Sequence, residues 1–377
     1  MLALAACSTP PAAAPVPTPA AQSPSPTSSP RPGSGPLAVL VQRAGAGEPY
    51  VIQLLRSDGR TLPAVHAMTR SLKSYFPPAS PCPAGGCASD SANYQLPETS
   101  VSSTRVYFLD GEADLKSLSP AGTVTLVRHL NVPANSNISF AVSPDDSRLA
   151  VGQLTYGAAG ATPAFSLRLY VENLVDGRGR VDLFVSDAVA EWPVGWHGGK
   201  LVVAVGQPGV FTGFNPYGAV EYHLVDADAG TRKESIGCSF GPLVAGGSAC
   251  WTPGELGRQD WTGATTQFRL DPTGMVSQVQ ESYVALSPDG SEVAAAVRAS
   301  TATTNTTLLF GDGSAATLAA DAAPLGWLDA SHVVILMTSD LAVVNVADKS
   351  VNPVIGLSKL PGQGFPSFFG VLPATLG

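Results

Sequence analysis

Short apolar runs bounded by turn-forming residues recur along the chain from residue 37 onward. One stretch shows the pattern clearly, with runs at 138–143, 148–154, 165–174 and 180–186. Runs of this length, rich in Val, Leu and aromatic residues and separated by Gly, Pro, Ser and Asp, are typical of β-strands. No long stretch has the 3.6-residue period of an amphipathic helix. The pattern therefore predicts an all-β chain.

Two of these strand pairs are nearly the same sequence. Residues 140–151 and 283–294 each consist of an apolar run, a Ser-Pro-Asp turn and a second apolar run. Proline presets the backbone of a turn, and Asp146 or Gly290 can adopt the left-handed conformation that follows, so each segment predicts a β-hairpin. A second repeat places Gly195-Trp196 before the run 201–205 and Gly326-Trp327 before 333–336.

The spacing of these units predicts a β-propeller. Units with four strands and a period of about 40–50 residues are typical of propeller blades. A further unit beginning at residue 37 brings the expected number of blades to seven, with six or eight as alternatives. The other units begin near residues 104, 140, 194, 244, 284 and 325.

The Ser-Pro-Asp hairpins resemble those of the TolB-like and WD40-like propellers of bacterial exported proteins. The resemblance covers the architecture of the chain but is sharp only in the two hairpins, and the Gly-His and Trp-Asp signatures of WD40 repeats are absent. It implies a propeller fold. Because propellers host hydrolases, lyases, dehydrogenases and binding proteins, it implies no particular function.

The N-terminus predicts an exported, lipid-anchored protein. Leu4-Ala5-Ala6-Cys7 resembles a bacterial lipobox, in which the cysteine thiol is acylated, although a complete signal peptide has a longer apolar region and a basic start. Residues 8–36 contain ten prolines and a single charge, which predicts an extended linker without a core. We therefore expect a signal remnant at 1–6, an acylated Cys7 and linker at 7–36, and a propeller at 37–377. A secreted form is the alternative to anchoring at the outer side of the cytoplasmic membrane.

Composition and charge narrow the partners. The 377 residues include 13% charged residues and carry a formal net charge of −8, and no cluster of Lys and Arg is apparent. Nucleic-acid binding requires such clusters to neutralise phosphates, so we expect no nucleic-acid partner.

Four cysteines remain if Cys7 is acylated. They form two local pairs, Cys82 with Cys87 and Cys238 with Cys250. An even number in an exported protein favours two disulfides. Zinc is the alternative, but the second Cys-x₂-Cys or paired His of a zinc site is missing.

Connections between second and third strands are predicted to be long, whereas the Ser-Pro-Asp turns are short. Long connections are expected at 155–164, 206–219, 252–265 and 299–306, all at one end of the blades, and binding residues are often found on such loops. Their aromatic and polar residues predict a binding face, unless they pack over the blade ends instead. The candidates are Phe211, Phe214, Tyr217, Trp251, Arg258, Asp260 and Trp261.

Motifs for catalysis are sparse. The five histidines are scattered without metal-ligand spacing, and no Gly-x-Ser-x-Gly or nucleotide-binding glycine motif is present. Glu255 and Asp260 form the one carboxylate pair worth testing for glycoside chemistry. We expect no cofactor and no metal. The sequence favours a binding or scaffold module for a protein or glycan at the cell envelope, with an extracytoplasmic hydrolase or lyase using carboxylates in the propeller funnel as the alternative.

Overall fold

The computed structural model confirms an all-β, seven-bladed propeller. It describes residues 35–43, 49–69, 99–157, 165–206, 219–237, 243–252, 255–268, 279–298, 306–311, 313–318, 321–338, 340–360 and 366–373. Within these residues there are strands and turns but no helix, and so none that could span a membrane. Contacts divide the chain into two units, of which Gly35–Gly377 contains every described strand.

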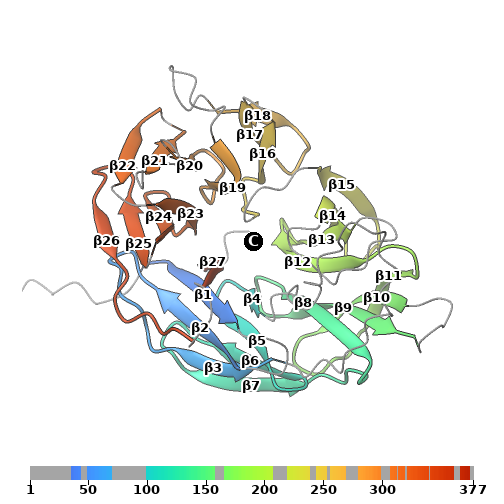
Figure 1. Ribbon diagram of the computed structural model, residues 1–377. Helices are drawn as coiled ribbons and strands as arrows, with labels where there is room; N and C mark the ends of the chain where they lie inside the picture. The colour runs from blue at the N-terminus through green and yellow to red at the C-terminus, as the bar shows by residue number, and fades with distance from the viewer. Residues whose placement is uncertain are drawn as a thin grey trace, which may run out of the picture. The chain divides into compact units, whose positions relative to one another are not determined.

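Seven sheets follow one another around a ring, as Figure 1 shows. Blades 1 to 3 are built from β1 (Leu37–Arg43), β2 (Pro49–Leu55), β3 (Val65–Met68) and β27 (Ser367–Leu372); β4 (Thr99–Val101), β5 (Val106–Asp110), β6 (Asp114–Leu118) and β7 (Val124–His129); and β8 (Ser136–Val142), β9 (Arg148–Tyr156), β10 (Phe165–Asn173) and β11 (Val181–Ser186).

The remaining blades have the same antiparallel arrangement. Blades 4 to 7 are built from β12 (Glu191–His197), β13 (Lys200–Gly206), β14 (Ala219–Val225) and β15 (Arg232–Ile236); β16 (Ser248–Thr252), β17 (Glu255–Gln259) and β18 (Thr265–Gln267); β19 (Val279–Leu286), β20 (Val293–Arg298), β21 (Thr306–Phe310) and β22 (Ala315–Leu318); and β23 (Ala322–Trp327), β24 (His332–Met337), β25 (Leu341–Asn345) and β26 (Val351–Pro353).

The two ends of the propeller sequence meet in blade 1. The C-terminal strand β27 pairs antiparallel with β1, so the strand order is β27-β1-β2-β3 and the ring closes between residues far apart in the chain. Residues 355–360 strengthen this closure. The Nε2 of the buried Gln53 donates to the Gly356 carbonyl at 2.8 Å, and the Leu360 amide donates to Oε1 of the buried Gln42 at 2.6 Å.

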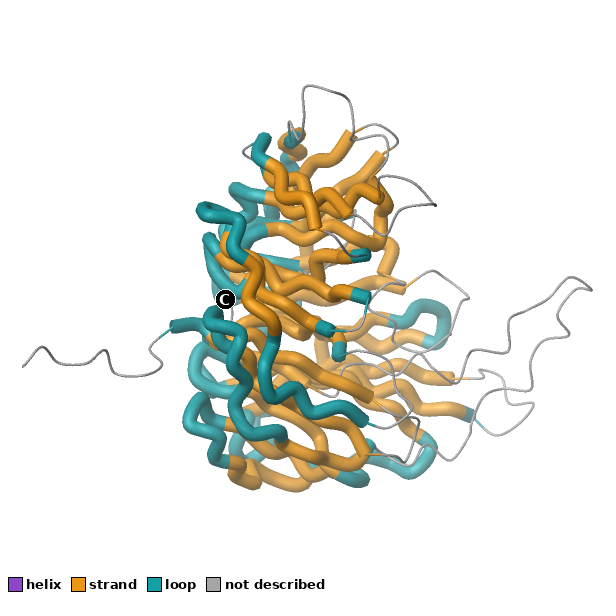
Figure 2. The backbone as a smooth tube through the Cα atoms, turned by 60° about the vertical axis from the view of Figure 1, so that its left-hand side comes forward, coloured by secondary structure: helices purple, strands orange, loops and turns teal. Residues whose placement is uncertain are grey.

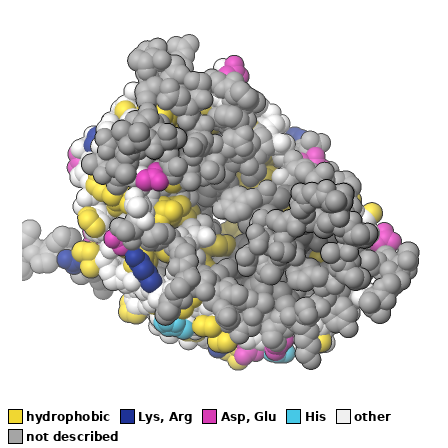
Figure 3. All heavy atoms as spheres, viewed as in Figure 1, with side chains coloured by type: hydrophobic (Ala, Val, Ile, Leu, Met, Phe, Trp, Pro, Cys, Tyr) yellow, Lys and Arg dark blue, Asp and Glu magenta, His cyan; other side chains and the backbone are white. Residues whose placement is uncertain are grey.

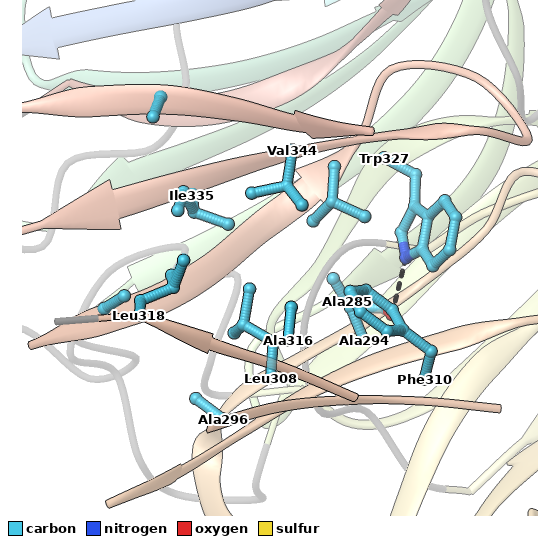
Figure 4. Close-up of a cluster of buried hydrophobic side chains, with 13 residues drawn as sticks. Ala285, Ala294, Ala296, Leu308, Phe310, Ala316, Leu318, Trp327, Ile335 and Val344 are labelled. Carbon is cyan, nitrogen blue, oxygen red and sulfur yellow. Dashed lines mark hydrogen bonds between the residues drawn. The ribbon is translucent and has the colours of Figure 1, made fainter. Parts of the chain in front are cut away.

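Adjacent blades pack face to face, which explains why the inner strands are continuous apolar runs. Every residue of β13 after Lys200 is buried, since both faces of this strand lie against a neighbouring blade. The interface between blades 6 and 7 has an apolar core (Figure 4). Its buried residues are Ala285, Ala294, Ala296, Leu308, Phe310, Ala316, Leu318, Ala322, Trp327, Val333, Ile335, Ala342 and Val344.

The repeated tryptophans connect neighbouring blades. The Trp327 indole Nε1 donates to the Ala285 carbonyl at 2.9 Å, shown as the dashed line in Figure 4. Trp196 donates to the Ala141 carbonyl at 3.5 Å. Both carbonyls lie two residues before a Ser-Pro-Asp turn. The tryptophan of each Gly-Trp repeat therefore forms a hydrogen bond with the Ser-Pro-Asp hairpin of the preceding blade.

Each Ser-Pro-Asp turn is closed by its own side chains. In the first, the Ser143 hydroxyl donates to Asp145 Oδ1 at 2.6 Å and accepts from the Arg148 amide at 2.9 Å. Ser287 and Asp289 repeat this arrangement in blade 6. The left-handed position of the turn is occupied by Asp146 (φ 59°) in one blade and by Gly290 (φ 70°) in the other. The two predicted hairpins are confirmed.

Candidate functional site

The strand connections distinguish two ends of the blades. Antiparallel neighbours place the first-to-second and third-to-fourth turns at one end, called here the turn side, and the second-to-third connections at the opposite end, called the loop side. The described turns gather along one side of the strands in Figure 2. Strand bounds confirm longer connections on the loop side at 157–164, 207–218 and 299–305, compared with a turn of Gly198 and Gly199 alone between β12 and β13.

The fourth long connection, predicted at 252–265, is wrong. Residues 255–259 form β17, so β16 and β17 are joined by residues 253–254 alone. The turn before β16 shows which strand of the blade β16 is. The Gly246 amide donates to the Pro288 carbonyl at 3.1 Å, as the Ser103 amide donates to Pro144 at 3.2 Å just before β5. Therefore β16 occupies the second-strand position, and the turn 260–264 lies on the turn side.

The predicted binding residues therefore do not all lie at the same end of the blades. Arg258 Nη1 donates to the carbonyl of Asp289, in the Ser-Pro-Asp turn of blade 6, at 3.2 Å. The Asp260 carboxylate closes its own turn by accepting from the Thr262 amide at 2.8 Å and the Thr262 hydroxyl at 2.6 Å. Both residues therefore lie at the turn side, away from the loop-side end of β16 at Thr252.

Trp261 is a core residue and is not part of an exposed face. It is 7% exposed, and its indole Nε1 donates to the Val244 carbonyl at 3.1 Å. Its ring stacks on His197, with ring centroids 4.7 Å apart and an interplanar angle of 19°. The aromatic side chain therefore closes the turn-side junction of blades 4 and 5, because it packs better there than in water.

The other predicted residues are only partly placed. Trp251 lies in β16 toward the loop side, but its side chain, together with Phe211, Phe214 and Tyr217, is outside the described residues. The structure thus brings Arg258, Asp260 and Trp261 together at the turn side, and the binding role of the remaining four residues stays a prediction.

Glu255 and Asp260 do not form a catalytic pair. They stand at the start of β17 and just after its end. A strand rises about 3.3 Å per residue, so their Cα atoms are roughly 17 Å apart. Glycosidase carboxylates lie about 5–9.5 Å apart. Glu255 Oε2 instead accepts from Gln267 Nε2 at 2.9 Å, within the blade.

The cysteines lie largely outside the described residues, including Cys7, Cys82, Cys87 and Cys238. Cys250 is in the middle of β16 and is disulfide-bonded. Its pairing with Cys238, and the Cys82–Cys87 disulfide, stay predictions.

A polar cluster that no sequence motif predicts lies on the face of blade 4 that meets blade 3. Glu191, at the start of the innermost strand β12, has a side chain only 3% exposed. Arg232 reaches it with two hydrogen bonds, Nη1 to Oε1 at 2.7 Å and Nη2 to Oε2 at 2.9 Å. The guanidinium also lies over the Phe184 ring of blade 3, 4.7 Å from its centroid. Two-point contact of this kind fixes the geometry of both partners.

A histidine adjoins this ion pair on the same face. His223 Nε2 donates to Glu221 Oε1 at 3.0 Å, and the side chain is 14% exposed. Its Nδ1 is buried and has no hydrogen-bond partner among the described residues. A buried nitrogen without a hydrogen bond lowers the stability of the folded state, so the polar residues on this face reduce the stability of the fold. We call Glu191, Glu221, His223 and Arg232 the blade 4 cluster.

Electrostatics at the turn side follow from local hydrogen bonds. The hydroxyls of Ser143 and Ser147 hold the pKa of Asp145 below its usual range. The Thr262 hydroxyl has the same effect on the pKa of Asp260. These carboxylates close turns, and within the described ranges no group of three or more His, Cys, Asp or Glu residues is arranged to hold a metal ion.

No protein-family model matches the chain, and no curated protein matches it. Solved structures with a similar fold include TolB from Acinetobacter baumannii, 11% identical over 90% of this chain and 66% of that chain, with a TM-score of 0.41. An oligogalacturonate lyase in complex with manganese is 11% identical over 83% of this chain and 77% of its own, with a TM-score of 0.33.

An acylaminoacyl peptidase from Pyrococcus horikoshii is likewise 11% identical, over 86% of this chain and 53% of its own, with a TM-score of 0.41. The chain therefore spans less than two thirds of the TolB structure and about half of the peptidase. Because a propeller carries many activities, these likenesses concern the fold alone.

Proposed function

We propose that this protein is an extracytoplasmic propeller, anchored through an acylated Cys7, that binds a protein or glycan partner with the loop side of its blades. The unequal connections carry this proposal. Compact turns that close themselves with Ser and Asp side chains define one end of each blade, while three blades have long second-to-third connections at the other. Binding residues are found most often on long loops held by a rigid scaffold.

The surface charge fits a protein or glycan partner better than a nucleic acid. In the view of Figure 3 the Lys and Arg side chains of the described residues are scattered and do not form a stripe. Several arginines are also neutralised within the fold. Arg168, for example, donates to both oxygens of Asp182 at 2.7 and 2.5 Å. An electrostatic contact with phosphates requires unpaired cations in a cluster.

Partner binding can be tested with a photo-crosslinking side chain introduced at Phe214, in the longest second-to-third connection. The matched control carries the same side chain at Ala121, in the turn between β6 and β7. Both variants are incubated with an envelope fraction and with soluble peptidoglycan fragments. We expect a discrete adduct from position 214 and none from 121. Equal labelling from both positions, or from neither, contradicts binding at the loop side.

Anchoring is tested separately from binding. The full-length gene is expressed with Cys7→Ser, and with Ser8→Ala as the control for a substitution at this position of the N-terminus. We expect the C7S protein to leave the membrane fraction and to lose incorporation of a labelled fatty acid, while the S8A protein keeps its membrane association and its label. C7S protein that still partitions with membranes rules out the lipid anchor and leaves the loop-side proposal standing.

A further inference from the structure

We draw no further inference here: the strongest candidate, the outer surface of the β10–β11 hairpin in blade 3, where Val175, Val181 and Val185 are exposed among arginines, carries nothing, because those arginines pair with Asp176 and Asp182 of the same hairpin and nothing in the described part of the chain shows what covers this surface.

Discussion

The interface between blades 3 and 4 and the interface between blades 6 and 7 share their backbone arrangement but differ in the side chains between the blades. Both have a Ser-Pro-Asp turn on one blade and a Pro-x-Gly-Trp strand on the next, and both tryptophans donate across to the matching carbonyl. A bulge follows each proline, Pro193 in β12 and Pro324 in β23. Backbone and anchor are therefore equivalent in the two places.

Strand register shows which positions correspond. Residues paired across the four strands of blade 4 are Trp196, Leu201, Val225 and Arg232. The residues paired in the same way across blade 7 are Trp327, Val333, Val344 and Val351. By the same registers, Glu191 corresponds to Ala322 and His223 to Ala342. Three of the four residues of the blade 4 cluster, Glu191, His223 and Arg232, thus stand where blade 7 has the apolar Ala322, Ala342 and Val351.

The ion pair is therefore not needed to build a propeller interface of this shape. Apolar side chains of suitable volume often stabilise a protein as well as a buried ion pair does, whereas half of such a pair is costly. We interpret the blade 4 cluster as a specificity device. In this interpretation the paired charges favour the packing of blade 3 on blade 4, its neighbour in sequence.

The largest expected effect comes from breaking the ion pair on one side. Glu191→Ala leaves the Arg232 guanidinium uncompensated, and the unfolding free energy should fall by about 3 kcal/mol, the lower end for a buried pair because the Arg232 side chain is 29% exposed. Adding Arg232→Val reproduces the blade 7 residues and should recover part of this loss. Urea unfolding of the two single variants and the double variant measures the coupling.

Val351→Ala in blade 7 serves as the control for the cycle. It removes aliphatic contacts without exposing a charge, and we expect a loss of about 1 kcal/mol. The unfolding free energies of Glu191→Ala, Arg232→Val and their double variant decide the interpretation. If the loss in the double variant equals the sum of the losses in the two single variants, the two charges are not coupled and the specificity interpretation is wrong.

A smaller effect distinguishes the two tryptophans. Trp196→Phe and Trp327→Phe remove the same volume from equivalent sites, so the difference between them reports the indole hydrogen bond. The Trp327 bond is 2.9 Å and the Trp196 bond 3.5 Å, so Trp327→Phe should be more destabilising by about 1 kcal/mol. Thermal midpoints of both variants measured at equal protein concentration provide the comparison. Equal midpoints would mean that the tryptophans act through packing alone.

Much of the fold could be predicted because the residues that end its strands lie next to those strands in the sequence. Gly, Pro and the Ser-Pro-Asp turns delimit the strands of blade 3, and the predicted runs 148–154 and 165–174 agree with β9 and β10 to within two residues. Blade number followed from the spacing of these units. What the local pattern could not predict was a strand with little apolar content. Leu256 is the single large apolar residue of β17, and pairing on both sides makes this segment a strand.

The candidate site was predicted less well, because composition does not say which surface an aromatic residue joins. Trp261 lies in a polar stretch, yet it packs on His197 of the preceding blade, 64 positions earlier in the chain. Glu191 and Arg232 are 41 residues apart and carry no shared motif. One signal was available, since alignment of the two Pro-x-Gly-Trp segments sets Glu191 against Ala322, a charge where the repeat has none.

The smallest effect concerns the two Ser-Pro-Asp turns and their dependence on pH. In blade 3, hydrogen bonds from Ser143 and Ser147 lower the pKa of Asp145. In blade 6, burial opposes the matching bonds from Ser291 and Ser287, although the pKa of Asp289 is still lowered on balance. A lowered folded-state pKa stabilises the fold above the unfolded value of about 3.9, and this contribution is lost as pH falls through the folded-state pKa. Asp145→Asn and Asp289→Asn should therefore each cost less than about 1 kcal/mol at pH 7, with the larger cost at Asp145. Both costs should shrink as the pH falls below about 3.9, the unfolded-state pKa. Thermal midpoints of each variant and the parent between pH 7 and pH 3 test this, and a cost that stays constant over that range would show that the carboxylate charge does not hold the turn.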